Sequence, residues 1–157
     1  MRWIIKPKPE DKIVKKISDE LGVDLNIASL LVNRGITNFK EAKDFFRPKL
    51  SSLHDPYMMK DMDKAVSRIQ SALTKNERIL IYGDYDVDGT TSVAMMASYL
   101  ENKTNKIDTY IPDRFNEGYG VSYKGIDYAA DNNFSLVIAL DCGVKALEKI
   151  EYAHSKG

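Results

Sequence analysis

Three short apolar runs alternate with helical patterns in the second part of the chain, and this alternation constrains the fold more than any other feature. The runs RILIY, IDTYIP and SLVIAL, at 78–82, 107–112 and 135–140, have the length of buried strands. Helical patterns follow them at 90–103, 123–133 and 145–157. Continuous apolar strands that alternate with helices predict an α/β fold with a parallel sheet and flanking helices on both faces.

The first part of the chain has a different pattern. Apolar residues recur at helical spacing in three short segments, and each has a start or stop signal, namely Gly22, Gly35 and Thr37 as a cap. The turn-rich RPKLSSLHDP follows at 47–56, before a longer amphipathic helix. We therefore expect a small N-terminal helical unit at 1–50 and an α/β domain at 51–157.

Charge and composition exclude several classes of protein. Lys+Arg and Asp+Glu both number 23, so no overall basic field attracts nucleic acid, and any such contact must be local. The single cysteine, Cys142, suits a reducing compartment. No segment approaches the roughly 18 apolar residues of a membrane helix. We expect a cytoplasmic protein with no membrane partner.

Acidic residues follow two of the three predicted strands directly. GDYDVDG at 83–89 follows the first, and DCG at 141–143 follows the third. Parallel sheets bind ligands beyond the carboxyl ends of their strands, so Asp84, Asp86, Asp88 and Asp141 are expected to share one crevice. The D-x-D-x-D-G pattern also begins an EF-hand calcium loop, but Met95 stands where that loop needs a bidentate glutamate. A strand also replaces the preceding helix, so we reject the EF-hand.

The pattern predicts a metal site for phosphate chemistry. Hard carboxylate oxygens suit Mg²⁺ or Mn²⁺, and alternate residues of an extended chain point to the same side. GTTS then opens a helix, where Gly89 permits close approach and free N–H groups attract phosphate. The hydroxyls of Thr90, Thr91 and Ser92 can assist.

The competing interpretation makes these aspartates caps and turn residues. Three aspartates, a glycine and a second strand-end aspartate together favour the metal site. Asp84 is either a ligand or a residue that orients the ligands.

At GDYDVDGTTS the sequence resembles the DHH phosphoesterase superfamily and, within it, the RecJ family of single-strand-specific exonucleases. The segments LLVNRGI, LHDPYMMKDMDKAVSRI, YIPDRFNEGYGVS and ALDCGV agree in order and in approximate spacing, so the similarity covers roughly residues 25 to 157. Together these segments are specific, whereas each alone is not.

The resemblance implies that Asp86, Asp88 and Asp141 are catalytic ligands of Mn²⁺ or Mg²⁺, which activates a water for attack on DNA. It implies a 5′→3′ exonuclease acting on single-stranded DNA in repair and recombination, with a single-stranded-DNA-binding protein or a helicase as partner. It also places Arg114 near a phosphate, in a loop shaped by Gly118 and Gly120. From the residues alone, Arg114 is equally a solvated side chain, and the role of Tyr119 in stacking on bases stays open.

Asp113 stands where an asparagine is common in the family. The Asp-His-His motif for which the superfamily is named is expected shortly after residue 157, so we expect a truncated, N-terminal part of a DHH-type domain. Such a part should bind metal weakly and cleave little.

Two other functions remain open. A DHH phosphodiesterase can act on short oligonucleotides or cyclic dinucleotides, and a non-catalytic relative can serve as a DNA-binding replication scaffold. Clustered carboxylates beside an anionic ligand count against the scaffold. His54, His154, Cys142 and Tyr85 are interpreted as turn, surface or packing residues.

Overall fold

A computed structural model describes residues 4–157, and the chain divides into two compact units, Met1–Met58 and Met59–Gly157. The expected boundary at residue 50 falls earlier than this division. Two short 3-10 helices, η1 at Leu50–Ser52 and η2 at Pro56–Met58, group with the first unit. The turn-rich segment is therefore part of the first unit.

The first unit is helical, as expected. Its helices are α1 (Asp11–Leu21), α2 (Leu25–Val32) and α3 (Phe39–Phe46). Gly22 ends α1 in the left-handed conformation, at φ 64°. The cap of α3 is Asn38 and not Thr37, because the Asn38 side chain accepts from the Glu41 N–H while Glu41 accepts from the Thr37 N–H. The core of this unit consists of Val14, Ile17, Ala28, Leu31, Ile36 and Ala42.

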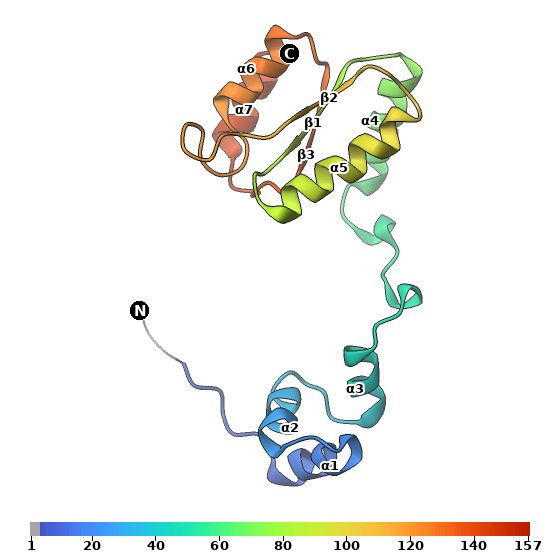
Figure 1. Ribbon diagram of the computed structural model, residues 1–157, viewed down its shortest axis with the longest axis vertical. Helices are drawn as coiled ribbons and strands as arrows, with labels where there is room; N and C mark the ends of the chain where they lie inside the picture. Colours follow the sequence, from blue (N-terminus) through green and yellow to red (C-terminus); the bar gives the residue numbers. More distant parts are fainter. Residues whose placement is uncertain (1–3) are drawn as a thin grey trace. The chain divides into compact units, whose positions relative to one another are not determined.

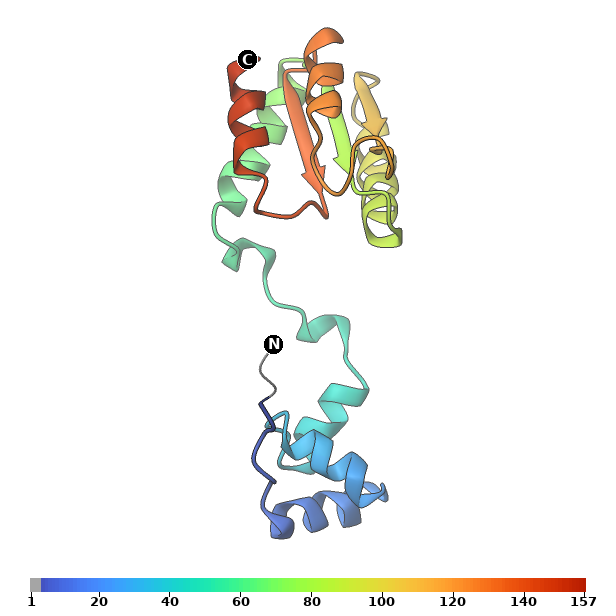
Figure 2. The same cartoon turned by 90° about the vertical axis from the view of Figure 1, so that its left-hand side faces the viewer.

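The second unit contains a three-stranded parallel sheet, which confirms the α/β prediction. Its strands are β1 (Ile79–Gly83), β2 (Ile107–Tyr110) and β3 (Leu136–Leu140), in the order β2-β1-β3. Figure 2 shows the strand arrows pointing the same way. Every residue of the central strand β1 is buried, as its continuous apolar run predicts.

Helices cover both faces of the sheet. Figure 1 shows α4 (Met62–Thr74) and α5 (Val87–Glu101) on one side, and α6 (Tyr123–Asp131) and α7 (Leu147–Ser155) on the other. Ile81 packs with Val93, Ala97 and Leu100 on the α5 side. Tyr82, the next residue along, packs with Val121 and Ile126 on the opposite side. Successive residues of β1 therefore point to opposite faces of the sheet and pack into two separate cores.

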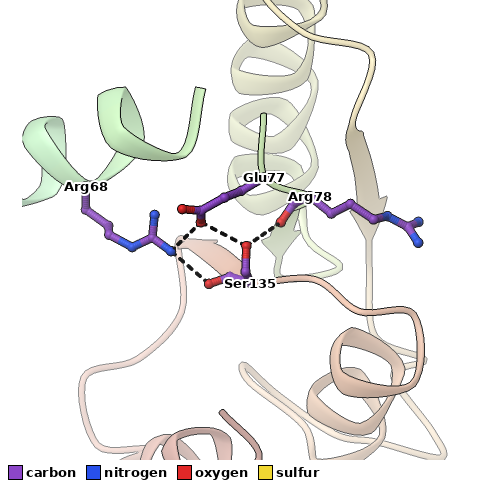
Figure 3. Close-up of polar contacts among 4 residues, drawn as sticks. All are labelled: Arg68, Glu77, Arg78 and Ser135. Carbon is purple, nitrogen blue, oxygen red and sulfur yellow. Dashed lines mark hydrogen bonds and ion pairs between the residues drawn. The ribbon is translucent and has the colours of Figure 1, made fainter. Parts of the chain in front are cut away.

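A polar network joins α4 to the amino ends of β1 and β3. Arg68 Nη2 donates to Glu77 Oε2 at 2.7 Å and to the Ser135 carbonyl at 2.9 Å, and Ser135 Oγ donates to the same Glu77 oxygen (Figure 3). The Ser135 N–H donates to the Arg78 carbonyl. This network lies at the amino ends of the strands, whereas the acidic residues follow their carboxyl ends.

Within residues 4–157, no helix is both long and apolar enough to cross a membrane.

Candidate metal centre at the carboxyl edge of the sheet

The strand register brings Asp84 and Asp141 together. Gly83, the last residue of β1, pairs with Leu140, the last residue of β3. The next residues along these two strands are Asp84 and Asp141. Neighbouring strands lie about 4.8 Å apart, so two segments far apart in sequence deliver carboxylates to one place.

Asp84 is the most unusual of the acidic residues. It is 1% exposed, and its Oδ1 accepts a long hydrogen bond of 3.3 Å from the Gly120 N–H. Its Oδ2 is buried and has no hydrogen-bond partner among the described residues. A buried carboxylate oxygen without a donor is costly, and a bound cation is one partner that would offset this cost.

Asp86 and Asp88 lie at the start of α5, and both are exposed. Asp86 is the N-cap, and its Oδ1 accepts from the Gly89 N–H at 2.9 Å. The helix begins at Val87, three residues earlier than the predicted start at Thr90, so the expected extended chain through Asp88 is wrong. The cap is the physical reason, because Asp86 satisfies a first-turn N–H and allows the helix to start at once.

Asp141 completes the cluster. Its backbone is in the left-handed region, at φ 54°, a conformation that aspartate tolerates better than most residues. Desolvation raises the pKa of the Asp141 carboxyl, and the charges of Asp86 and Asp88, a hydrogen bond with Asp86 and the charge of Asp84 raise it further. Asp141 is nevertheless exposed. A bound cation would offset the repulsion between the carboxylates, and would thereby lower the pKa of Asp141 again.

Carboxylate oxygens are suitable ligands for a divalent cation, but too few of them are gathered here for a complete site. Within residues 4–157, no group of three or more His, Cys, Asp or Glu side chains is gathered closely enough to hold a metal ion. Hard oxygens and the unpartnered Asp84 Oδ2 are the donors that Mg²⁺ and Mn²⁺ prefer. These residues offer part of a metal site.

The first turn of α5 is partly occupied by its own contacts. The Gly89 N–H is bound to Asp86, and Thr90 Oγ1 donates to the Asp86 carbonyl at 2.7 Å. Thr91 is exposed and Ser92 is half-buried. Gly89 allows a close approach, but to backbone, because a Cβ here would lie 2.3 Å from the Asp84 carbonyl oxygen.

The loop after β2 borders the acidic residues. Gly118 and Gly120 adopt φ 80° and 72°, which favours glycine. The Arg114 guanidinium lies 5.3 Å from the centre of the half-buried Tyr85 ring. Tyr119 is 61% exposed. Desolvation raises the pKa of Tyr119, and the charges of Asp84, Asp141 and Asp86 raise it further.

Two residues of this region escape sequence reasoning, namely Tyr82 and Glu117. Buried Tyr82 donates to the Gly120 carbonyl at 3.0 Å, and Glu117 accepts from the Tyr110 hydroxyl at 2.9 Å. Tyr82 and Gly120 are 38 residues apart, so no local pattern predicts their contact. The one available signal is a polar tip on a tyrosine inside an apolar strand, because a buried tyrosine hydroxyl needs a partner.

Cys142, His54 and His154 are the other polar residues considered in the sequence. Burial raises the pKa of the Cys142 thiol to about 11, and the charges of Asp84 and Asp141 add to this shift, so the thiol stays protonated at neutral pH. His54 and His154 are exposed. An open hollow of about 740 Å³ is lined by Tyr119, Gly120, Val121 and residues 143–149.

Known proteins resemble this chain in sequence. The profile of the DHH family, N-terminal domain, matches residues 78–157. The single-stranded-DNA-specific exonuclease RecJ of Bacillus subtilis is 40% identical over the whole chain, which covers 20% of that relative. RecJ of Escherichia coli is 29% identical over 82% of the chain and 22% of the relative. The chain thus spans about a fifth of the length of the curated relatives it matches.

Two solved structures resemble the chain. A crystal structure of exonuclease RecJ bound to manganese matches 62% of the chain with a TM-score of 0.56 and 28% identity, and the chain covers 25% of it. A crystal structure of RecJ from Thermus thermophilus in complex with Mn²⁺ matches 96% of the chain with a TM-score of 0.61, and the chain covers 20% of it. At 23% identity, this second likeness shows the fold alone.

Proposed function

The chain belongs to the DHH family, and from this premise we propose that it supplies part of the metal centre of an exonuclease that removes nucleotides from the 5′ end of single-stranded DNA. The observation that carries the proposal is the buried Oδ2 of Asp84, which has no hydrogen-bond partner among the described residues, in a region where the charges of Asp86, Asp88 and Asp84 all raise the pKa of Asp141. Relatives named as single-stranded-DNA-specific exonucleases support the substrate. The polarity, and the role in repair and recombination, follow from the family resemblance.

Asp84, Asp86, Asp88 and Asp141 would hold Mn²⁺ or Mg²⁺. When bound, the ion supplies a Lewis acid for the phosphodiester and lowers the pKa of a coordinated water. The four carboxylates keep the crevice anionic, so a phosphodiester approaches it only when their charge is offset. The ligands that this chain offers are too few for a closed cage, and we expect weak binding by the chain alone.

Neighbouring residues have roles on the substrate. Arg114 would bind a backbone phosphate with its planar guanidinium, which lies over the Tyr85 ring. Tyr119 has the exposure needed to stack on a base, in the loop that Gly118 and Gly120 shape. Thr91 and Ser92 would donate to a phosphate from α5, whereas the Gly89 N–H and the Thr90 hydroxyl already donate to Asp86.

We place this activity in the cytoplasm, where single-stranded DNA and reduced cysteine coexist. A single-stranded-DNA-binding protein or a helicase is the proposed protein partner, on the family resemblance.

The test is Mn²⁺-dependent release of nucleotides from end-labelled single-stranded DNA by the complete gene product, wild type against Asp86→Asn. Early loss of a 5′ label, abolished by the substitution, is expected. Intact DNA together with hydrolysis of a dinucleotide would transfer the function to a small phosphodiester. Metal-independent binding of DNA without cleavage would indicate a scaffold.

A further inference from the structure

The loop between β2 and α6 is pinned by one carboxylate. Glu117 Oε1 accepts from the Asp113 N–H at 2.9 Å, which closes the loop on itself. Its Oε2 accepts from the Tyr110 hydroxyl at the end of β2 and from Ser122 Oγ at the start of α6. Both oxygens of Glu117 therefore accept hydrogen bonds from the loop and from the elements on either side of it.

Glu117 suits this role at neutral pH. Burial raises the pKa of Glu117, but hydrogen bonds from Ser122, the Asp113 N–H and Tyr110 outweigh burial and hold it below its usual value. An ionised glutamate is an acceptor only, which matches its three donors.

The far end of the loop is fixed to β1. The hydroxyl of Tyr82, a residue that is 1% exposed, donates to the Gly120 carbonyl at 3.0 Å and accepts from the Ser122 N–H at 3.1 Å. Tyr82 lies on β1, two residues before Asp84, which directly follows this strand. The carboxyl end of β1 thus brings together the anchor of the loop and the carboxylate that the loop contacts.

These contacts determine where the Gly120 N–H points. With its carbonyl held by Tyr82 and its φ at 72°, Gly120 directs its N–H at Asp84 Oδ1. This hydrogen bond is long, at 3.3 Å, so it depends on the loop being held in place. It occupies Oδ1 of Asp84, whereas Oδ2 is buried and has no hydrogen-bond partner within residues 4–157.

We propose that Glu117 is a positioning residue of the acidic site: by pinning residues 113–122 it holds the Gly120 N–H on Asp84 and so determines which Asp84 oxygen faces a cation. The inference rests on the proposed metal centre. Partners that orient metal ligands in this way are worth roughly 10–100-fold in affinity.

The test uses the full 157-residue chain with Glu117→Ala, Glu117→Gln and, as a control, Glu148→Gln, which makes the same change in charge on a residue that lines the hollow. Hydrogen exchange of the Gly120 amide, measured by NMR without metal, reports the loop directly. Binding of Mn²⁺, measured by the electron paramagnetic resonance of the free ion, reports the site.

We expect about tenfold faster exchange at Gly120 and about tenfold weaker Mn²⁺ binding in Glu117→Ala. Glu117→Gln should lie between Ala and wild type, because its amide keeps one acceptor but turns the other into a donor facing two hydroxyls. Glu148→Gln should match wild type. The β1 amides should stay as protected from hydrogen exchange as in wild type, which shows that the sheet is still folded. If Glu117→Ala loses this protection, the result for Glu117→Gln is used instead.

If the Gly120 amide of the folded Glu117 variant exchanges at the wild-type rate, the inference is overturned, irrespective of the Mn²⁺ affinity. Faster exchange with unchanged Mn²⁺ affinity would also overturn it, because the loop would then not position Asp84. Failure of the wild-type chain to bind Mn²⁺ at all is a different result, and it would count against the proposed metal centre.

Discussion

At the residue scale, Asp84 combines burial with an unsatisfied oxygen, which is a cost in the metal-free chain. Asp84→Asn should therefore abolish the response to Mn²⁺ yet raise the unfolding free energy without metal, by roughly 1 kcal/mol, because a neutral amide is cheaper to bury than an unpaired charge. Urea unfolding with and without Mn²⁺ measures both effects. Asp63→Asn, in the exposed first turn of α4, is the control.

A loss of stability in metal-free Asp84→Asn would contradict this account, since it would show that the carboxylate has a stabilising partner within the chain.

Gly89 is a second residue with a sharp prediction. A Cβ at this position would lie 2.3 Å from the carbonyl oxygen and 2.7 Å from the nitrogen of Asp84, and backbone cannot move aside cheaply. Gly89→Ala should lower the unfolding free energy by about 3 kcal/mol. Gly143→Ala is the matched control, because its Cβ would meet only the Tyr119 ring at 3.4 Å. Equal stability of the two variants in urea would refute the close approach of α5 to β1.

Sequence alone indicates Asp86, Asp88 and Asp141, because strand-end position is a local property. The sequence does not show that the Gly120 N–H donates a hydrogen bond to one oxygen of Asp84, since these residues are 36 apart and meet only through a folded loop. Whether the four carboxylates ligate a metal remains a prediction.

At the element scale, the network of Arg68, Glu77 and Ser135 holds α4 against the amino ends of β1 and β3 (Figure 3). Arg68→Met should lower the midpoint of thermal unfolding by a few degrees at neutral pH and leave Mn²⁺ binding unchanged. The effect is modest because Arg68 Nη1 is itself buried without a partner among the described residues. Lys64→Met is the control, since Lys64 is 76% exposed in its ion pair with Asp61.

The stability lost in Arg68→Met should depend on pH. The hydrogen bond from Arg68, followed by that from Ser135, holds the pKa of Glu77 below its usual value. The stabilisation is then complete above the ordinary glutamate pKa and disappears as pH falls through the lowered folded value. Unfolding midpoints from about pH 7 to about pH 3 should show wild type and Arg68→Met converging in acid. A constant difference would exclude the ionised Glu77 as the cause.

The elements were largely predictable. Each apolar run became a strand and each helical pattern a helix, because parallel strands between helices are apolar on both faces. The start of α5 was missed because an N-cap at Asp86 and a turn at Asp86 have the same sequence. The strand order was also beyond sequence, since packing decides which strand lies in the middle.

At the scale of the whole molecule, the two units have separate cores, and the first is small. Ile17 is fully buried there, so Ile17→Ala should cost about 2–5 kcal/mol and unfold the first unit. Amide resonances of the β1 residues and the Mn²⁺ response should remain as in wild type. Collapse of the β1 resonances together with those of α1 would show that the two units fold as one.

Metal binding at the acidic residues can be measured by titrating the full chain with Mn²⁺ and following the electron paramagnetic resonance of the free ion, in wild type, Asp86→Asn, Asp141→Asn and the control Asp63→Asn. We expect weak but saturable binding, which Asp86→Asn or Asp141→Asn weakens at least about tenfold and Asp63→Asn leaves unchanged. Binding that is equal in all four proteins, or undetectable in wild type, would contradict a metal centre at the carboxyl edge of the sheet.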